Sequence, residues 1–182
     1  AKKDSLAMMI ESLNLLDTTV LNRIEFRVIG VTKDKMLEKM SHIPKQVVFK
    51  GRIARERVLE ELSTADFAML LRDPSKRFTK AGFPSKVAES LSSGTPMITN
   101  LTSDLGDYLI DGENSIIVEN YSMEAFAKAI SRAANTDKND LKKMQENARK
   151  TAENYFDYRV YQNEISHLVS MKYRLISISI FR

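Results

Sequence analysis

Apolar and polar residues follow two recurring patterns along this chain, one helical and one typical of strands. From residue 5 to residue 22 the apolar positions recur every three or four residues, which places them on one face of a helix. Short apolar runs that indicate buried strands lie at 26–31, 46–50, 67–71, 96–100 and 115–118. Further helical patterns cover 34–41, 55–63, 84–93, 104–110, 122–134, 138–155 and 158–169. This alternation predicts an α/β fold, a Rossmann-like parallel sheet with helices on both faces.

The C-terminal end departs from this pattern. Residues 175–181 alternate between apolar residues and serine, as a strand does. Such a segment could pair with a sheet edge, stay disordered or promote association, and the sequence does not choose among these. We therefore predict one domain over residues 1–170 and a tail of unknown role over 171–182.

The composition is that of a folded domain. Of the 182 residues, 43% are hydrophobic and 29% are charged, and the length suits one domain with a full core. The absence of cysteine excludes disulfides, thiolate zinc sites and cysteine nucleophiles. The two histidines, His42 and His167, are far apart in the sequence, which argues against a histidine-rich metal site. No apolar run approaches the roughly 20 residues that span a bilayer, so we expect a cytoplasmic protein.

The net charge of +4 favours anionic partners such as nucleotide diphosphates or acidic lipid surfaces. Nucleic acid is another common anion. However, the chain has no RNA-binding aromatic motif, no helix-turn-helix pattern and no long Lys/Arg block. We therefore expect no nucleic-acid partner.

The most informative stretch is residues 81–98, AGFPSKVAESLSSGTPMI, which predicts a glycine turn, a helix and a buried strand. Pro84 suits the start of a helix, where no backbone donor is needed, and Gly94 suits the left-handed residue that follows a helix. The first turn then offers N–H groups and the positive end of the helix dipole, with Ser85 and Lys86 beside them. Such an arrangement binds phosphate. A well-capped helix without a ligand is the competing interpretation.

Glu89 lies one turn further along the same helix, close to the face of Ser85 and Lys86. Its carboxylate cannot bind phosphate, but it can accept hydrogen bonds from both hydroxyls of a ribose. Gly82 has no side chain, so a diphosphate or sugar could approach the backbone N–H groups of Gly82 and Phe83. These features together indicate a nucleotide site. The alternative for Glu89 is a surface ion pair with Lys86, worth well under ~1 kcal/mol.

The same stretch resembles the C-terminal, donor-binding domain of retaining GT-B glycosyltransferases of group 1, also called family four. The resemblance continues through 47–53, 65–71, 98–100, 108–114 and 116–118, and covers roughly residues 1–165. It implies the C-terminal half of a GT-B fold. In the family a strand and a glycine-rich turn precede the first helix, so the chain resembles a fragment of a two-domain protein whose acceptor domain lies elsewhere.

The resemblance implies a role for Glu89. This residue matches the second glutamate of a family pair, which accepts hydrogen bonds from the nucleotide ribose. The position of the first glutamate holds Ala81, so this chain departs from the family pattern. That departure puts in doubt any contact between a carboxylate of this domain and the donor sugar.

The resemblance also implies two further contacts with the nucleotide. The turn formed by Gly51, Arg52 and Ile53 lies where the base binds, with Ile53 or the stem of Arg52 packing on it. Lys3 stands in the position of the family's phosphate-binding lysine, although Lys2 is equally well placed.

Two arginines, Arg72 and Arg77, follow the strand predicted at 67–71. A sugar diphosphate in this loop would need cations, and the planar fork of arginine suits phosphate oxygens. Arginines in loops are more often solvated, which is the alternative interpretation.

The resemblance implies transfer of a sugar from a nucleotide-diphosphate sugar to a hydroxyl acceptor, with retention of configuration, in surface-polysaccharide or glycoconjugate synthesis. The implied partners are the nucleotide-sugar donor, the protein's own N-terminal acceptor domain and the inner membrane surface, with no metal and no other cofactor. Catalytic groups are expected in the missing domain, so this domain alone is expected to be inactive. Two alternatives stay open: a nucleotide-sugar epimerase of GT-B architecture, and a non-enzymatic α/β nucleotide-binding module.

Overall fold

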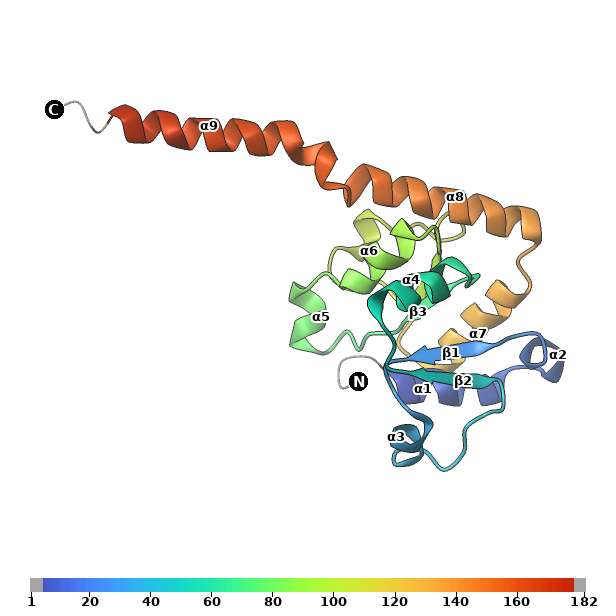
Figure 1. The fold of residues 1–182 in the computed structure, drawn as a ribbon. Helices are drawn as coiled ribbons and strands as arrows, with labels where there is room; N and C mark the ends of the chain where they lie inside the picture. Colours follow the sequence, from blue (N-terminus) through green and yellow to red (C-terminus); the bar gives the residue numbers. More distant parts are fainter. Residues whose placement is uncertain (1–4, 179–182) are drawn as a thin grey trace.

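Helices and strands alternate through the computed structural model, which describes residues 5–178 (Figure 1). The strands are β1 (Phe26–Ile29), β2 (Val47–Gly51), β3 (Ala68–Leu70), β4 (Met97–Thr99) and β5 (Ser115–Ile117). The helices are α1 (Leu6–Glu11), α2 (Thr18–Leu21), α3 (Lys33–Leu37), α4 (Arg55–Ser63), α5 (Arg77–Ala81), α6 (Ser85–Ser92), α7 (Met123–Ala134), α8 (Lys138–Tyr155) and α9 (Gln162–Ile178). Single 3-10 turns form η1 (Ser12–Leu15), η2 (Leu105–Asp107) and η3 (Tyr158–Tyr161). Each predicted strand is present, so the predicted α/β class is confirmed.

All the strand pairs are parallel, and they are arranged in two sheets. β1 pairs with β2, with Phe26 opposite Val47. β3, β4 and β5 form a three-stranded sheet in that order, in which Met69, Ile98 and Ile116 share one register position. Among the described residues no main-chain ladder joins the two sheets. The two halves are held together by side chains.

Helices cover both faces of the three-stranded sheet because its side chains alternate in direction. Ile98 and Ile116 belong to a buried cluster that also includes residues of α1, η1 and α7, and the partly buried Met69 packs against it. Leu70 and Met97 belong to a second cluster, which they share with buried residues of α6 and α8. Figure 1 shows α8 running along α6 at one end of the domain. The predicted arrangement of helices on both faces is therefore confirmed.

One core joins the two sheets. Phe26 and Val28 of β1 belong to the same buried cluster as Ile98 of β4 and Val118, which follows β5. Phe126 of α7 also lies in this cluster and has no exposed surface. Apolar burial between the sheets therefore takes the place of hydrogen bonds between their strands.

Two local predictions differ from the structure. The helix predicted over 5–22 is divided, because Leu16 has an extended backbone (φ −80°, ψ 144°) and Asp17 begins a new helix. Leu16 is still buried, so the chain turns there while its apolar face stays in the core. Helix α5 was not predicted, since its five residues are too few to show a helical period.

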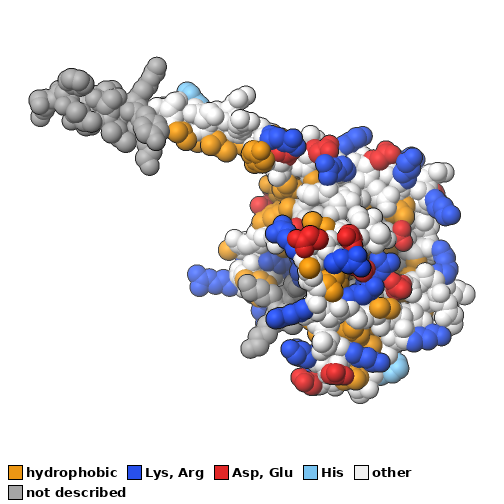
Figure 2. Space-filling view, in the orientation of Figure 1, with side chains coloured by type: hydrophobic (Ala, Val, Ile, Leu, Met, Phe, Trp, Pro, Cys, Tyr) orange, Lys and Arg blue, Asp and Glu red, His pale blue; other side chains and the backbone are white. Residues whose placement is uncertain are grey.

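Helix α9 projects away from the rest of the domain (Figure 1). It continues to Ile178, so the strand-like interpretation is wrong for residues 175–178, and residues 179–181 lie outside the described part of the chain. Ile165, Leu168 and Val169 are exposed on α9, and Figure 2 shows hydrophobic side chains along one side of it. No helix between residues 5 and 178 is long and apolar enough to cross a membrane.

Candidate functional site

Helix α6 begins and ends as its sequence predicts. Pro84 precedes it with an extended backbone, and the Pro84 carbonyl accepts a hydrogen bond from Val87 N–H at 2.9 Å. Gly94 follows it at φ +71°, a left-handed conformation that costs other residues about 1–2 kcal/mol. Val87, Ser90 and Leu91 are buried and recur at helical spacing, so they fix one face of α6 against the core. The opposite face of the helix is left to solvent or a ligand.

The solvent side of α6 carries the predicted ligand groups. Ser85 and Lys86 are exposed in the first turn, and Glu89 is half-buried one turn later. The Val87 N–H donates to the Pro84 carbonyl, and the two N–H groups before it, the first two of α6, come too early in the helix to have an acceptor within it. The helix dipole at this end favours anions. Among the described residues no ion pair of Glu89 is found, and its contact with a ribose stays a prediction. This face can hold a phosphate beside a carboxylate that accepts hydrogen bonds.

Arg72 follows β3 and is buried, with 6% of its surface exposed. Its guanidinium donates hydrogen bonds to the Phe78 carbonyl at 3.1 Å, the Gly82 carbonyl at 3.0 Å and the Thr102 hydroxyl at 3.3 Å. The guanidinium carbon also lies 5.8 Å from the centroid of the Phe78 ring. Arg72 therefore spans α5 and the segment that leads into α6. Its direct contact with a diphosphate stays a prediction.

Asn100, which follows β4, fixes the backbone of Arg72. The Asn100 amide nitrogen donates to the Arg72 carbonyl at 2.8 Å, and the Asn100 amide oxygen accepts from Arg72 N–H at 2.9 Å. Gly82 passes close to the end of α5, since a Cβ on it would lie 3.2 Å from the Phe78 carbonyl oxygen. Asn100 and Thr102 were not predicted from the sequence to belong to this site. The sequence feature that could have indicated them is the presence of polar residues just after a buried strand.

Phe83 is anchored in an aromatic cluster. Its ring centroid lies 5.5 Å from that of Tyr108 and 5.3 Å from that of Phe156, and Tyr108 lies 5.4 Å from Tyr155. Such edge and tilted contacts are the favoured geometries of aromatic pairs. Burial, with smaller contributions from two nearby aspartates, raises the pKa of the Tyr108 hydroxyl above its ordinary value. The cluster ties the segment before α6 to the end of α8.

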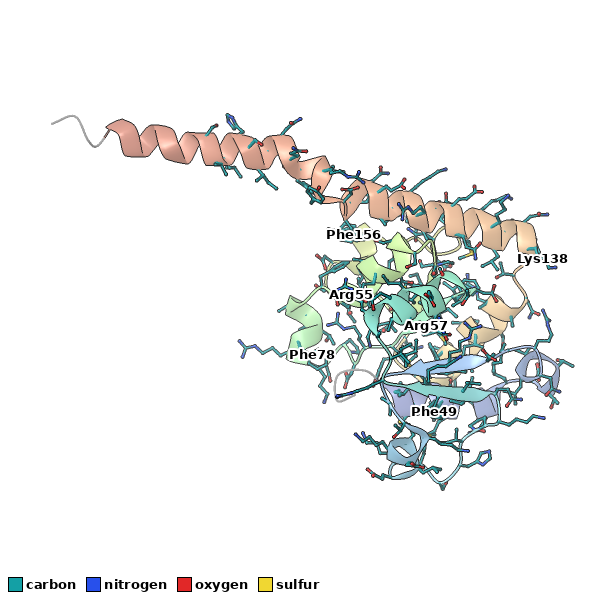
Figure 3. All side chains as sticks on the ribbon, in the orientation of Figure 1. Phe49, Arg55, Arg57, Phe78, Lys138 and Phe156 are labelled. Carbon is teal, nitrogen blue, oxygen red and sulfur yellow. The ribbon has the colours of Figure 1, made fainter. Side chains whose placement is uncertain are left out.

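The turn after β2 holds the residues predicted to face a nucleotide base. Gly51 has φ +64°, and its carbonyl accepts a hydrogen bond from Gly30 N–H at 2.6 Å. Arg52 is exposed and Ile53 is half-buried. Helix α4 starts directly after this turn, with Arg55 in its first turn (Figure 3). The turn thus lies at the carboxyl end of its strand, where ligands bind to parallel sheets.

Two other predicted cations have separate positions. Arg77 begins α5 and is exposed. Lys3 lies outside the described residues, so its predicted contact with phosphate stays a prediction. Among residues 5–178 no group of three or more His, Asp or Glu side chains is placed to hold a metal ion.

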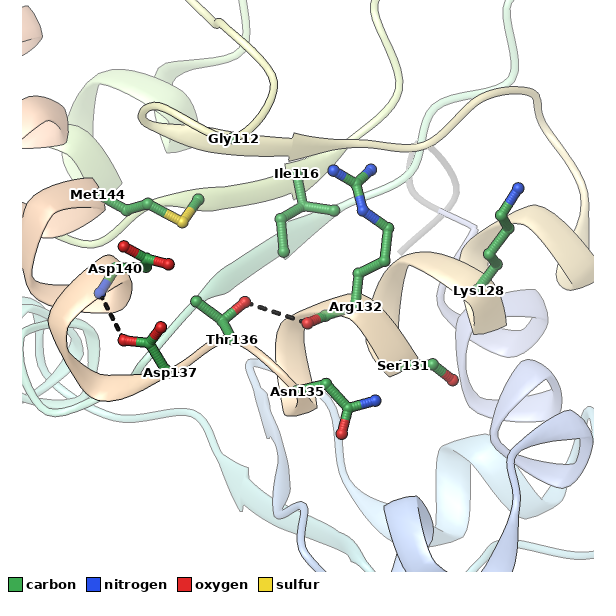
Figure 4. A pocket seen from close by; sticks show the side chains of 10 residues that line it. All are labelled: Gly112, Ile116, Lys128, Ser131, Arg132, Asn135, Thr136, Asp137, Asp140 and Met144. Atoms are coloured by element: carbon green, nitrogen blue, oxygen red, sulfur yellow. Dashed lines mark hydrogen bonds between the residues drawn. The ribbon is translucent and has the colours of Figure 1, made fainter.

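A hollow of about 610 Å³ lies away from these residues, between the end of α7 and the start of α8 (Figure 4). It includes Gly112, just before β5, so it lies at the amino edge of the three-stranded sheet. Its charged groups already have partners: Arg132 pairs with Asp111 at 2.9 Å, and Asp137 caps α8 by accepting from Asp140 N–H at 3.0 Å. The candidate site is therefore the one at the carboxyl edge, around α6, and not this hollow.

The amino-acid sequence from residue 1 to residue 151 matches the model of a family described as glycosyl transferases group 1. The chain belongs to this family. The resemblance drawn from residues 81–98 is therefore confirmed. No curated protein matches the sequence.

Solved GT-B glycosyltransferases share the fold of this group 1 domain. Anabaena HepE in complex with UDP and glucose has a TM-score of 0.72 and 13% identity, over 94% of this chain and 46% of that one. Sucrose-phosphate synthase from Thermosynechococcus elongatus has a TM-score of 0.75 and 16% identity, over 96% of this chain and 44% of that one. A mutant of S. aureus TarM in complex with Fondaparinux, alpha-GlcNAc-glycerol and UDP has a TM-score of 0.68 and 18% identity, over 91% of this chain and 33% of that one. The chain thus spans less than half the length of each of these structures.

Proposed function

We propose that this chain is the donor-binding domain of a retaining glycosyltransferase that transfers a sugar from a nucleotide-diphosphate sugar to a hydroxyl acceptor. The observation that carries the proposal is on α6, where a first turn able to bind phosphate precedes the half-buried Glu89 carboxylate by one helical turn. Membership of a transferase family supports the reaction class. The presence of UDP in the HepE and TarM structures supports the donor class.

In this proposal the domain positions the donor and stabilises its leaving group. The first-turn N–H groups of α6 and the helix dipole hold the diphosphate, whose negative charge increases as the bond to the sugar breaks. Glu89 accepts hydrogen bonds from the ribose hydroxyls, and the turn at Gly51, Arg52 and Ile53 packs on the base. Groups fixed before the reaction lower the barrier because they need no reorganisation during it. A second domain supplies the acceptor and the catalytic groups that contact it.

The proposal also includes a cellular setting. Surface-polysaccharide or glycoconjugate synthesis at the inner face of the membrane would place this domain beside acidic lipids, which the net charge of +4 favours. The enzyme would then act from the cytoplasmic side, where nucleotide sugars are supplied.

A thermal-shift panel of UDP-, GDP- and ADP-sugars tests the proposed donor class. A ligand that binds only the folded chain raises its melting temperature by mass action. We expect one nucleotide series to raise the melting temperature, and the same free sugars, as controls, to leave it unchanged. If no nucleotide sugar changes the melting temperature, the proposed function is wrong.

We expect Glu89→Ala to weaken nucleotide binding by roughly 1–3 kcal/mol, because it removes charge-assisted hydrogen bonds to the ribose. The fold should be retained, since Glu89 lies on the solvent side of α6 and makes no ion pair within the described residues. Isothermal titration calorimetry with the nucleoside diphosphate measures the change. Glu89→Gln is the matched control, because it keeps the shape and removes the charge. Parental affinity in both variants would show that Glu89 is an ordinary surface carboxylate.

We expect nucleotide binding by this chain to be independent of magnesium. The anion is held in this proposal by backbone N–H groups and cations, and the described residues contain no group of three or more His, Asp or Glu side chains placed to hold a metal ion. The same calorimetric titration in excess EDTA and in excess magnesium should give similar dissociation constants. A strict requirement for the metal would overturn this expectation.

A further inference from the structure

Arg72 occupies an unusual place for an arginine of this chain. It is the only arginine among the buried residues of the described part of the chain. Both its backbone N–H and its backbone carbonyl are hydrogen-bonded to the Asn100 side chain. Burying a guanidinium has a large desolvation cost unless its N–H groups are hydrogen-bonded. Two of its acceptors are main-chain carbonyls, those of Phe78 and Gly82, on either side of the end of α5. A residue buried in this way fixes the conformation of the segment that it spans.

That segment leads directly into α6. Gly82 accepts the hydrogen bond from Arg72, Phe83 follows, and Pro84 is the residue that precedes the first helical turn. A Cβ on Gly82 would lie 3.2 Å from the Phe78 carbonyl oxygen, so a larger residue there would crowd one of the two carbonyls that Arg72 binds. On the other side, Phe83 is held by Tyr108 and Phe156. Arg72 and the aromatic cluster thus hold two adjacent residues, Gly82 and Phe83, of the connection between α5 and α6.

We infer that Arg72 is a positioning residue for the nucleotide site, acting through the backbone of residues 78–84 rather than through contact with the phosphates. The inference rests on the proposed function and gives Arg72 a different role from the direct phosphate contact predicted from the sequence. Its chemical basis is the planar fork of arginine, which reaches two carbonyls and the Thr102 hydroxyl at once. The three N–H donors of a lysine ammonium all sit on one nitrogen, so they cannot reproduce the spacing of this fork.

The test compares Arg72→Lys with a matched control, Arg149→Lys, in the 182-residue chain. Arg149 also donates to a main-chain carbonyl, that of Ser92, but at the opposite end of α6. Affinities for UDP, GDP and ADP are measured by calorimetry at a temperature where circular dichroism shows each variant to be folded. We expect Arg72→Lys to bind the preferred nucleotide roughly tenfold more weakly or worse, because displaced groups lose their alignment with the ligand. We expect Arg149→Lys to change the melting temperature and to keep the parental affinity.

A milder variant covers the case in which Arg72→Lys does not fold. Thr102→Val keeps the side-chain shape and removes one acceptor of the guanidinium, so we expect a smaller loss of affinity and shifted amide resonances at Gly82 and Phe83. If the parent binds a nucleotide and the folded Arg72 and Thr102 variants bind it equally well, the inference is wrong and the proposed function stands. If the parent binds none of the three nucleotides, the proposed function fails and the inference fails with it.

Discussion

The purified 182-residue chain is expected to bind a nucleotide sugar and to transfer no sugar to an acceptor. Transfer needs an acceptor hydroxyl held in line with the anomeric carbon, and such orientation accounts for several orders of magnitude in rate. The chain spans 46% or less of the solved glycosyltransferases that share its fold, and the proposed function places the acceptor on a second domain. An assay for release of nucleoside diphosphate in the presence of sugar acceptors should therefore give only the uncatalysed background.

Two controls make this result informative. Binding of the same donor, shown by the thermal-shift panel, demonstrates that the chain is folded and competent to bind. A complete glycosyltransferase of the family, assayed with its own donor and acceptor, demonstrates that the assay detects transfer. Transfer of sugar to an acceptor by the 182-residue chain alone would contradict the proposal that a second domain supplies the acceptor and the catalytic groups.

Phe126→Ala is expected to lower the free energy of unfolding by about 3–5 kcal/mol, the range for truncating a fully buried phenylalanine. Phe126 has no exposed surface and belongs to the cluster that joins the β1–β2 pair to the three-stranded sheet. No ladder of hydrogen bonds joins these sheets within the described residues, so a cavity at Phe126 removes part of what holds them together. Urea denaturation followed by circular dichroism measures the change.

Phe126→Leu is the control for this prediction, because it keeps most of the apolar volume and should cost less than the alanine variant. If the loss for Phe126→Ala equals the whole free energy of unfolding of the domain, the variant will be unfolded even without urea, and this result agrees with the prediction. A loss below about 1 kcal/mol for Phe126→Ala would show that the core is not assembled around this residue.

The sequence predicted those parts of the fold that depend on local pattern. The buried strands follow from continuous apolar runs, and α6 follows from Pro84, Gly94 and the spacing of Val87 and Leu91. Helix α5 was missed because five residues are too few to show a helical period. The break at Leu16 was missed because an apolar residue there fits an unbroken helix as well as the observed turn, in which it is also buried. These features depend on tertiary packing, which a local pattern does not contain.

The candidate site was predicted in part for a similar reason. The groups on the solvent side of α6 could be located because helical spacing fixes their relative positions. The burial of Arg72 could not, since it depends on Thr102 and Asn100, which lie about thirty residues further along the chain. Likewise, the contact between Phe83 and Phe156 joins two distant parts of the sequence. The sequence therefore predicts which groups face the ligand, and the structure adds the residues packed behind them.

The proposal that the donor nucleotide binds at α6 is tested most directly by an NMR titration of the ¹⁵N-labelled chain. The ligand is the nucleoside diphosphate that the thermal-shift panel selects. We expect the amide resonances of Gly82–Glu89 and of Gly51–Ile53 to shift together, with one dissociation constant, and those of the hollow near Arg132 and Asp140 to stay unchanged. Shifts confined to the hollow, or no saturable shift in α6, would contradict the assignment of the donor site to this helix.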